Sequence, residues 1–137
     1  MSDTIRMVDY FYVMVPDRPG EAARILGRLK EAGVNLLSFT AFPTSGGQSQ
    51  IDLVPEKAEA LLKAAKAGGL ALSEKKTAFF IQGKDRPGAV GETLKKLSDA
   101  MVNVHAANAC CGASGGFGFI LWVKPQHHAA AAKALGI

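Results

Sequence analysis

The sequence predicts an α+β fold in which one structural unit occurs twice. The tetrapeptide Asp17-Arg18-Pro19-Gly20 recurs 68 residues later as Asp85-Arg86-Pro87-Gly88. An internal duplication fixes the architecture before any residue is given a role, because both copies then fold in the same way. Two shorter matches follow in the same order: Val34-Asn35 with Val102-Asn103, and Ser45-Gly46-Gly47 with Ser114-Gly115-Gly116.

Within each copy the residue pattern predicts alternating strands and helices. Met7–Val15 is rich in Val, Tyr and Phe and ends before Pro16, which is typical of a strand, and Thr77–Gln82 is its counterpart. Apolar residues at helical spacing follow each tetrapeptide, and Gly33 stands where a helix C-cap belongs. The remaining predicted elements are strands Val34–Phe42, Val102–Cys111, Gln48–Val54 and Gly116–Lys124, and second helices that begin at Pro55 and Pro125.

The order of these elements predicts the topology. A fourth strand at Leu70–Glu74 closes the first copy, so that each copy follows the β-α-β-β-α-β plan of a ferredoxin-like unit, an antiparallel sheet with helices on one face. The predicted domains are residues 1–75 and 76–137. The second copy lacks its final strand, because helix His127–Leu135 leads directly to the last two residues. The segment Met1–Met7 and a second chain are the two candidates for that open edge.

The third strand of the second copy has no polar face. In Phe117–Val123 both alternating sets of side chains are apolar. An antiparallel sheet with one solvated face would carry polar residues at every second position. We therefore expect the sheet of the other repeat or of a second chain to cover this face, and we predict a homodimer built on sheet contacts.

Composition favours a small folded protein of the cytoplasm. The 137 residues carry a formal net charge of +4, show no signal-peptide pattern and contain no apolar run near the roughly 18 residues of a membrane span. The two cysteines, Cys110 and Cys111, are adjacent and form no CxxC motif. His105, His127 and His128 have no carboxylate cluster beside them. We expect no enzyme activity, no cofactor, no metal and no membrane partner.

The two Asp-Arg-Pro-Gly loops are the strongest candidate sites. Proline fixes φ, glycine lets the backbone approach a ligand, and the free N–H groups of the next helix point outward at the positive end of its dipole. That geometry suits a carboxylate. Asp17 and Asp85 accept hydrogen bonds either from a ligand ammonium or from local backbone N–H groups in a tight turn, and both interpretations remain open.

The succession of hydrophobic strand, tetrapeptide, amphipathic helix and Gly33-Val34-Asn35-Leu36 resembles the ACT domain, a regulatory module of many enzymes of amino-acid metabolism. The resemblance covers nearly the whole chain as two tandem copies, although Met101 replaces Gly33 in the second. It implies a small ligand, most often an amino acid, held between two domains by the loop after the first strand and by the start of the second strand. The residues implicated are Asp17, Arg18, Pro19, Gly20, Asn35 and Leu36 in copy one, and Asp85, Arg86, Pro87, Gly88, Asn103 and Val104 in copy two.

The chemistry of these residues agrees with the resemblance. An α-amino acid needs donors for its carboxylate and acceptors for its ammonium, and a loop N–H cluster with Asp and Asn supplies both. Asn35 and Asn103 also fit a purely local role at a strand start. A regulator without a catalytic domain further implies an enzyme or regulator partner that reads the bound state.

Two alternatives belong to other classes. Gly116–Trp122 resembles the third-strand motif of RNA-recognition motif domains, with Phe79-Phe80-Ile81 at the place of their first-strand motif, which would make the chain a single-stranded nucleic-acid binder. The small net charge and Gly115 at the place of a basic residue weigh against nucleic acid. The other alternative is a structural dimerisation module that binds no ligand.

Overall fold

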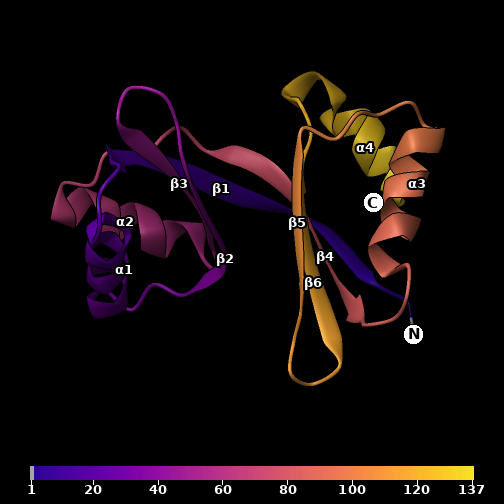
Figure 1. Ribbon diagram of the computed structural model, residues 1–137, viewed down its shortest axis with the longest axis horizontal. Helices are drawn as coiled ribbons and strands as arrows, with labels where there is room; N and C mark the ends of the chain where they lie inside the picture. The colour runs from indigo at the N-terminus through magenta and orange to yellow at the C-terminus, as the bar shows by residue number, and fades with distance from the viewer. Residues whose placement is uncertain (1) are drawn as a thin grey trace. The chain divides into compact units, whose positions relative to one another are not determined.

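The computed structural model describes residues 2–137, which form two compact units (Figure 1). The first-repeat unit is Asp9–Lys76. The second-repeat unit is Thr77–Ile137 together with the N-terminal residues up to Val8. Compared with the predicted domains 1–75 and 76–137, the N-terminal residues therefore lie with the second repeat.

The first-repeat unit contains a three-stranded antiparallel sheet and two helices. Its strands follow the order β2-β3-β1, and β1 and β2 both pair antiparallel with β3. Its core joins the sheet to the helices through side chains such as Phe11, Ile25, Leu53 and Leu61. The elements are β1 (Thr4–Pro16, from Asp9 onward in this unit), α1 (Glu21–Glu31), β2 (Leu36–Pro43), β3 (Gln48–Pro55) and α2 (Ala58–Gly68).

The second-repeat unit repeats this plan with strand order β4-β6-β5, again antiparallel. Figure 1 shows α3 and α4 beside each other on one face of this sheet. Phe79, Leu97, Phe119 and Leu121 lie at the centre of its core. The elements are β4 (Lys76–Lys84), α3 (Ala89–Asp99), β5 (Ala106–Cys111), β6 (Gly116–Trp122), the 3-10 helix η1 (Pro125–His127) and α4 (His128–Leu135).

The fourth-strand positions differ between the repeats. In the second-repeat unit the N-terminal part of β1 lies next to β4. The N-terminal segment therefore fills the sheet edge that the missing fourth strand of the second repeat would leave open. In the first-repeat unit the predicted strand Leu70–Glu74 is wrong, because this segment is irregular. Ser73 donates its N–H to the Tyr12 carbonyl (2.8 Å), but its hydroxyl accepts the Tyr12 N–H (2.9 Å), which replaces the backbone carbonyl that a regular ladder uses.

Several predicted boundaries are also wrong. Strand β1 already begins at Thr4 rather than Met7, and β2 begins at Leu36 rather than Val34. Pro55 ends β3, and α2 begins three residues later at Ala58. The predicted strand Val102–Cys111 begins only at Ala106, because the Val102 N–H donates to the Leu97 carbonyl (2.9 Å) and is held in the terminal turn of α3. The predicted helix start at Pro125 is confirmed in the form of η1.

The helix ends show one local cost of the duplication. After α1 the left-handed position is Gly33, with φ 73°. After α3 the same position is Met101, with φ 58°, where an L side chain is strained. Since Met101 is 90% exposed, packing offers no compensation for that strain.

Within residues 2–137, no helix is long and apolar enough to cross a membrane.

Candidate ligand-binding site

Each Asp-Arg-Pro-Gly loop leads directly into a helix. Gly20 (φ 90°) precedes α1 and Gly88 (φ 83°) precedes α3, and both backbone conformations favour glycine. In the described chain no side chain caps either helix. In α3 the Ala89 and Glu92 N–H groups donate to the Arg86 and Gly88 carbonyls (3.3 and 3.0 Å). This leaves the Val90 and Gly91 N–H groups for an anion at the positive end of the helix dipole.

The two loops differ in what their aspartates contact. The Asp17 carboxylate accepts a hydrogen bond from the Ser49 hydroxyl (2.9 Å). Across residues 2–137 the Asp85 carboxylate has no such bond and no ion pair, because the strand register places Phe117 where the first repeat has Ser49. Only the second loop thus presents an uncommitted carboxylate.

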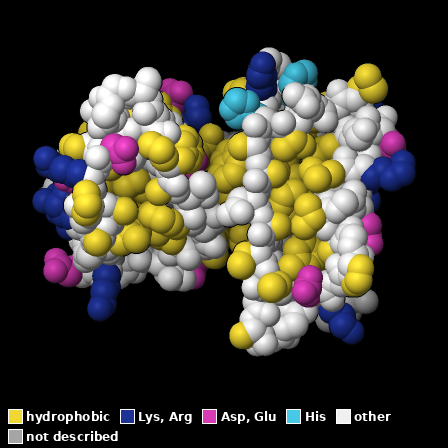
Figure 2. Space-filling view, in the orientation of Figure 1, with side chains coloured by type: hydrophobic (Ala, Val, Ile, Leu, Met, Phe, Trp, Pro, Cys, Tyr) yellow, Lys and Arg dark blue, Asp and Glu magenta, His cyan; other side chains and the backbone are white. Residues whose placement is uncertain are grey.

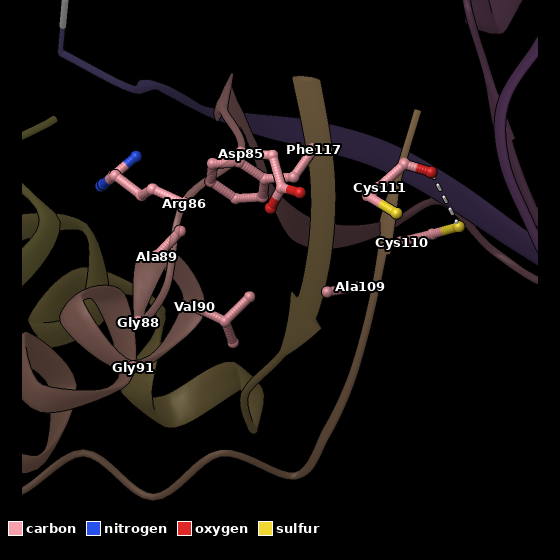
Figure 3. A pocket seen from close by; sticks show the side chains of 10 residues that line it. All are labelled: Asp85, Arg86, Gly88, Ala89, Val90, Gly91, Ala109, Cys110, Cys111 and Phe117. Carbon is pink, nitrogen blue, oxygen red and sulfur yellow. Dashed lines mark hydrogen bonds between the residues drawn. The ribbon is translucent and has the colours of Figure 1, made fainter. Parts of the chain in front are cut away.

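Asp85 lines a cavity of about 250 Å³ that Figure 3 shows from close by. The cavity lies between the loop, the first turn of α3, the end of β5 and the Phe117 ring on β6. One side offers a carboxylate and helix amides, and the other offers small apolar side chains. The lining residues are Asp85, Arg86, Gly88, Ala89, Val90, Gly91, Ala109, Cys110, Cys111 and Phe117.

Arg86 lines the cavity with its stem, whereas Figure 3 shows its guanidinium turned away from Asp85 and the β5 cysteines. The guanidinium donates to both carboxylate oxygens of Asp3 (3.1 Å each) and to Glu92 Oε2 (2.5 Å). These hydrogen bonds lower the pKa of the Asp3 carboxyl and raise the pKa of Arg86. In the first repeat Arg18 is mostly exposed and pairs with Glu21 (2.8 Å).

The strand-start residues predicted for the same site lie elsewhere in each unit. Because β1 and β2 both pair antiparallel with β3, they run parallel, so Asn35 before β2 lies at the opposite end of the sheet from the Asp17 loop. The Asn35 side chain donates to Glu56 Oε2 (2.9 Å). With Leu36 it lines a separate cavity of about 380 Å³ beside the end of α1.

The second repeat repeats this separation. Asn103 is exposed, and Val104 is partly buried against the core at the far end of α3 from the Asp85 loop. A single unit therefore brings together Asp85, Arg86 and Gly88 of the predicted residues, and does not add Asn103 or Val104 to them.

Sequence reasoning missed the β5 wall of the cavity. The predicted topology makes the first two strands of each repeat parallel, here β4 and β5. The end of β5 then lies beside the loop that follows β4, so the position of Ala109–Cys111 next to the loop could have been predicted. No sequence signal marked Asp3, whose contact depends on the N-terminal segment filling the sheet edge. Among residues 2–137 no group of three or more His, Cys, Asp and Glu side chains could hold a metal ion.

The aromatic residues of the RNA-recognition alternative are placed unfavourably. Phe79, Phe117 and Phe119 belong to the core between sheet and helices and are at most 6% exposed. Stacking on a base needs an accessible ring face. Figure 2 shows that in the second-repeat unit hydrophobic side chains gather between β5 and α3, on the core side of the sheet.

No protein-family model and no curated protein matches the sequence. Solved structures, in contrast, match nearly the whole chain. A protein from Bacteroides thetaiotaomicron has a TM-score of 0.81 at 13% identity and covers 96% of this chain and 88% of its own. The ligand-free regulatory subunit of aspartate kinase from Thermus thermophilus has a TM-score of 0.65 at 14% identity, covering 98% and 94%. Its counterpart from Thermus flavus has a TM-score of 0.62 at 14% identity, covering 99% and 95%.

The fold is that of tandem ACT domains. The prediction of two ferredoxin-like units in an ACT-like arrangement is thereby confirmed. The two Thermus structures with this fold are regulatory subunits of aspartate kinase. At identities of 13–14% the likeness establishes the fold.

Proposed function

We propose that this chain is a non-catalytic regulatory protein that binds a free amino acid in the cavity of the second repeat. The observation that carries the proposal is the uncommitted Asp85 carboxylate beside the uncapped start of α3 in one cavity. The similarity to regulatory subunits of aspartate kinase supports it at the level of fold.

The lining offers a place for each part of an amino acid. The ammonium group pairs with Asp85, and the carboxylate accepts hydrogen bonds from the first-turn amides of α3. The side chain then meets Val90, Ala109 and Phe117. The volume of about 250 Å³ is below the roughly 300–1,000 Å³ of pockets for drug-sized ligands, which favours a ligand of amino-acid size.

A second copy of the chain completes the site in this proposal. Within one unit Asn103 and Val104 lie far from the Asp85 loop, and Asn35 and Leu36 lie far from the Asp17 loop, so only another domain can bring these residues to a loop. Strand β5 lies at the edge of its sheet, and all six of its residues are exposed. It carries no Lys or Pro to discourage pairing, which favours a homodimer joined at sheet edges.

Regulation follows if the ligand binds one state of the assembly more tightly than another. The ligand then shifts the population toward that state by its difference in affinity, and an enzyme or regulator partner reads the change. The Asp17, Arg18, Pro19 and Gly20 loop is a second, weaker site in this scheme, because Ser49 already occupies the Asp17 carboxylate.

The cysteines provide a direct test. Cys110 and Cys111 are the two cysteines of the chain, both are exposed, and both line the cavity. The full chain is incubated with each of the twenty amino acids, and the rate of thiol labelling by a colorimetric disulfide reagent is measured together with the melting temperature. One or a few amino acids are expected to slow labelling and raise the melting temperature. If none of the twenty changes either quantity, the proposal is wrong.

A further inference from the structure

The N-terminal segment contributes one charged side chain to the surroundings of the cavity. Asp3 forms a bidentate ion pair with Arg86, with both oxygens 3.1 Å from the guanidinium nitrogens. The Asp3 side chain is 13% exposed and that of Arg86 33%. A carboxylate this far removed from solvent is retained only with a partner, and Arg86 supplies it.

Strand β4 is shaped to admit Asp3. A Cβ atom at Gly83 would lie 2.0 Å from Asp3 Oδ1 and 3.0 Å from the Phe117 ring. The strand register places Val15 at the corresponding position of the first repeat. Gly83 is therefore a difference between the repeats that makes room for Asp3, and the Asp3 contact belongs to the second repeat alone.

This contact sets the charge that a ligand meets. Arg86 is the one cation among the described residues that line the cavity, and both Asp3 and Glu92 pair with it. Figure 3 shows its guanidinium turned away from Asp85. Asp85 then remains as a negative charge beside an apolar wall of Ala109 and Val90.

We propose that Asp3 is a specificity-determining residue: by neutralising Arg86, it makes the cavity select amino acids with uncharged side chains against those with a side-chain carboxylate. The proposal rests on amino-acid binding at this cavity as the function. A side-chain carboxylate of aspartate or glutamate would approach Asp85 without a free cation to compensate, whereas a small apolar side chain meets only apolar atoms.

The test compares dissociation constants for alanine, valine, asparagine, aspartate and glutamate in the full-length wild type, in Asp3→Asn and in Gly83→Ala. Asp3→Asn removes the charge, and Gly83→Ala displaces the side chain while keeping its charge. In both variants the preference for the best neutral amino acid over aspartate should fall by about tenfold, since Asp3→Asn removes the partly screened charge that pairs with Arg86 and Gly83→Ala moves that charge away from Arg86. The matched control is Glu21→Gln, which removes the partner of Arg18 in the first repeat and should leave the preference unchanged.

Each result is decisive in a different way. A preference that stays within about twofold of wild type in Asp3→Asn, with binding intact, overturns the role of Asp3 and leaves the proposed function standing. An equal change in Glu21→Gln overturns it as well, because the effect would then be a general effect of charge. Wild-type protein that binds none of the twenty amino acids removes the proposed function, and the inference with it.

Discussion

The difference between the two aspartates gives the sharpest test of which loop binds the ligand. Replacing Asp85 by Asn keeps the size of the side chain and removes the charge that pairs with an ammonium group. The matched replacement Asp17→Asn makes the same chemical change in a loop where the Ser49 hydroxyl already occupies the carboxylate. The two variants therefore separate a role in binding from a role in the turn.

The expected change in the dissociation constant follows from the environment of Asp85. A hydrogen bond to a charged group in a partly open cavity contributes about 1.5–3 kcal/mol to binding. Since each 1.4 kcal/mol is a factor of ten, the dissociation constant of the bound amino acid should rise by roughly 10- to 100-fold in Asp85→Asn. In Asp17→Asn it should change by less than about twofold, because the cavity that Asp85 lines lies in the other repeat.

Titration calorimetry with the amino acid that protects the cysteines measures both constants directly. The rate of thiol labelling without ligand serves as the control, since an unchanged rate shows that the end of β5 keeps its exposure. Equal losses in the two variants would mean that the loops act together or through folding. An unchanged constant in Asp85→Asn would refute the assignment of the ammonium site to this carboxylate.

Three further predictions concern stability, each measured by chemical denaturation. Met101→Gly should raise the free energy of unfolding by about 1 kcal/mol, and Gly33→Met should lower it by a similar amount, because both positions have positive φ. Burial raises the pKa of the Asp52 carboxyl, so its charged form is disfavoured in the folded protein. Asp52→Asn should therefore stabilise the protein at neutral pH. This gain in stability should fade as the pH falls through the raised folded-state pKa toward the ordinary value of 3.8. Phe119→Ala should cost about 3–5 kcal/mol, since the ring is 1% exposed in the core; a loss below about 1 kcal/mol would contradict that role.

The repeat made the fold predictable, because a duplicated pattern constrains every element twice. The tetrapeptide predicted the start of both α1 and α3, where a turn with a left-handed glycine is needed whatever the tertiary packing. The strand predicted at Leu70–Glu74 was wrong for a reason that residue patterns do not contain. Regular pairing at this edge needs the Tyr12 N–H to donate to a backbone carbonyl. In the structure it donates to the Ser73 hydroxyl instead.

The cavity was predictable in its loop and not in its far wall. Asp85, Arg86 and Gly88 were identified from the motif, whereas Cys110 and Cys111 were described only as adjacent cysteines without a CxxC motif. The motif also predicted the same binding role for both loops, because both contain Asp. What separates them lies on the neighbouring strand, where Ser49 and Phe117 occupy the same register position.

The divergence of the repeats bears directly on function. A duplicated unit that only dimerises does not need an uncommitted carboxylate in one loop and a hydrogen-bonded carboxylate in the other. In the first repeat Ser49 supplies that partner, and in the second Phe117 does not, while Gly83 admits Asp3 to hold the neighbouring arginine aside. These two differences between the repeats, together with Asp3, thus act in the same direction, toward an open anionic site beside helix amides. A ligand that carries both an ammonium and a carboxylate group satisfies both parts of that site at once, which is why we favour binding over a purely structural role.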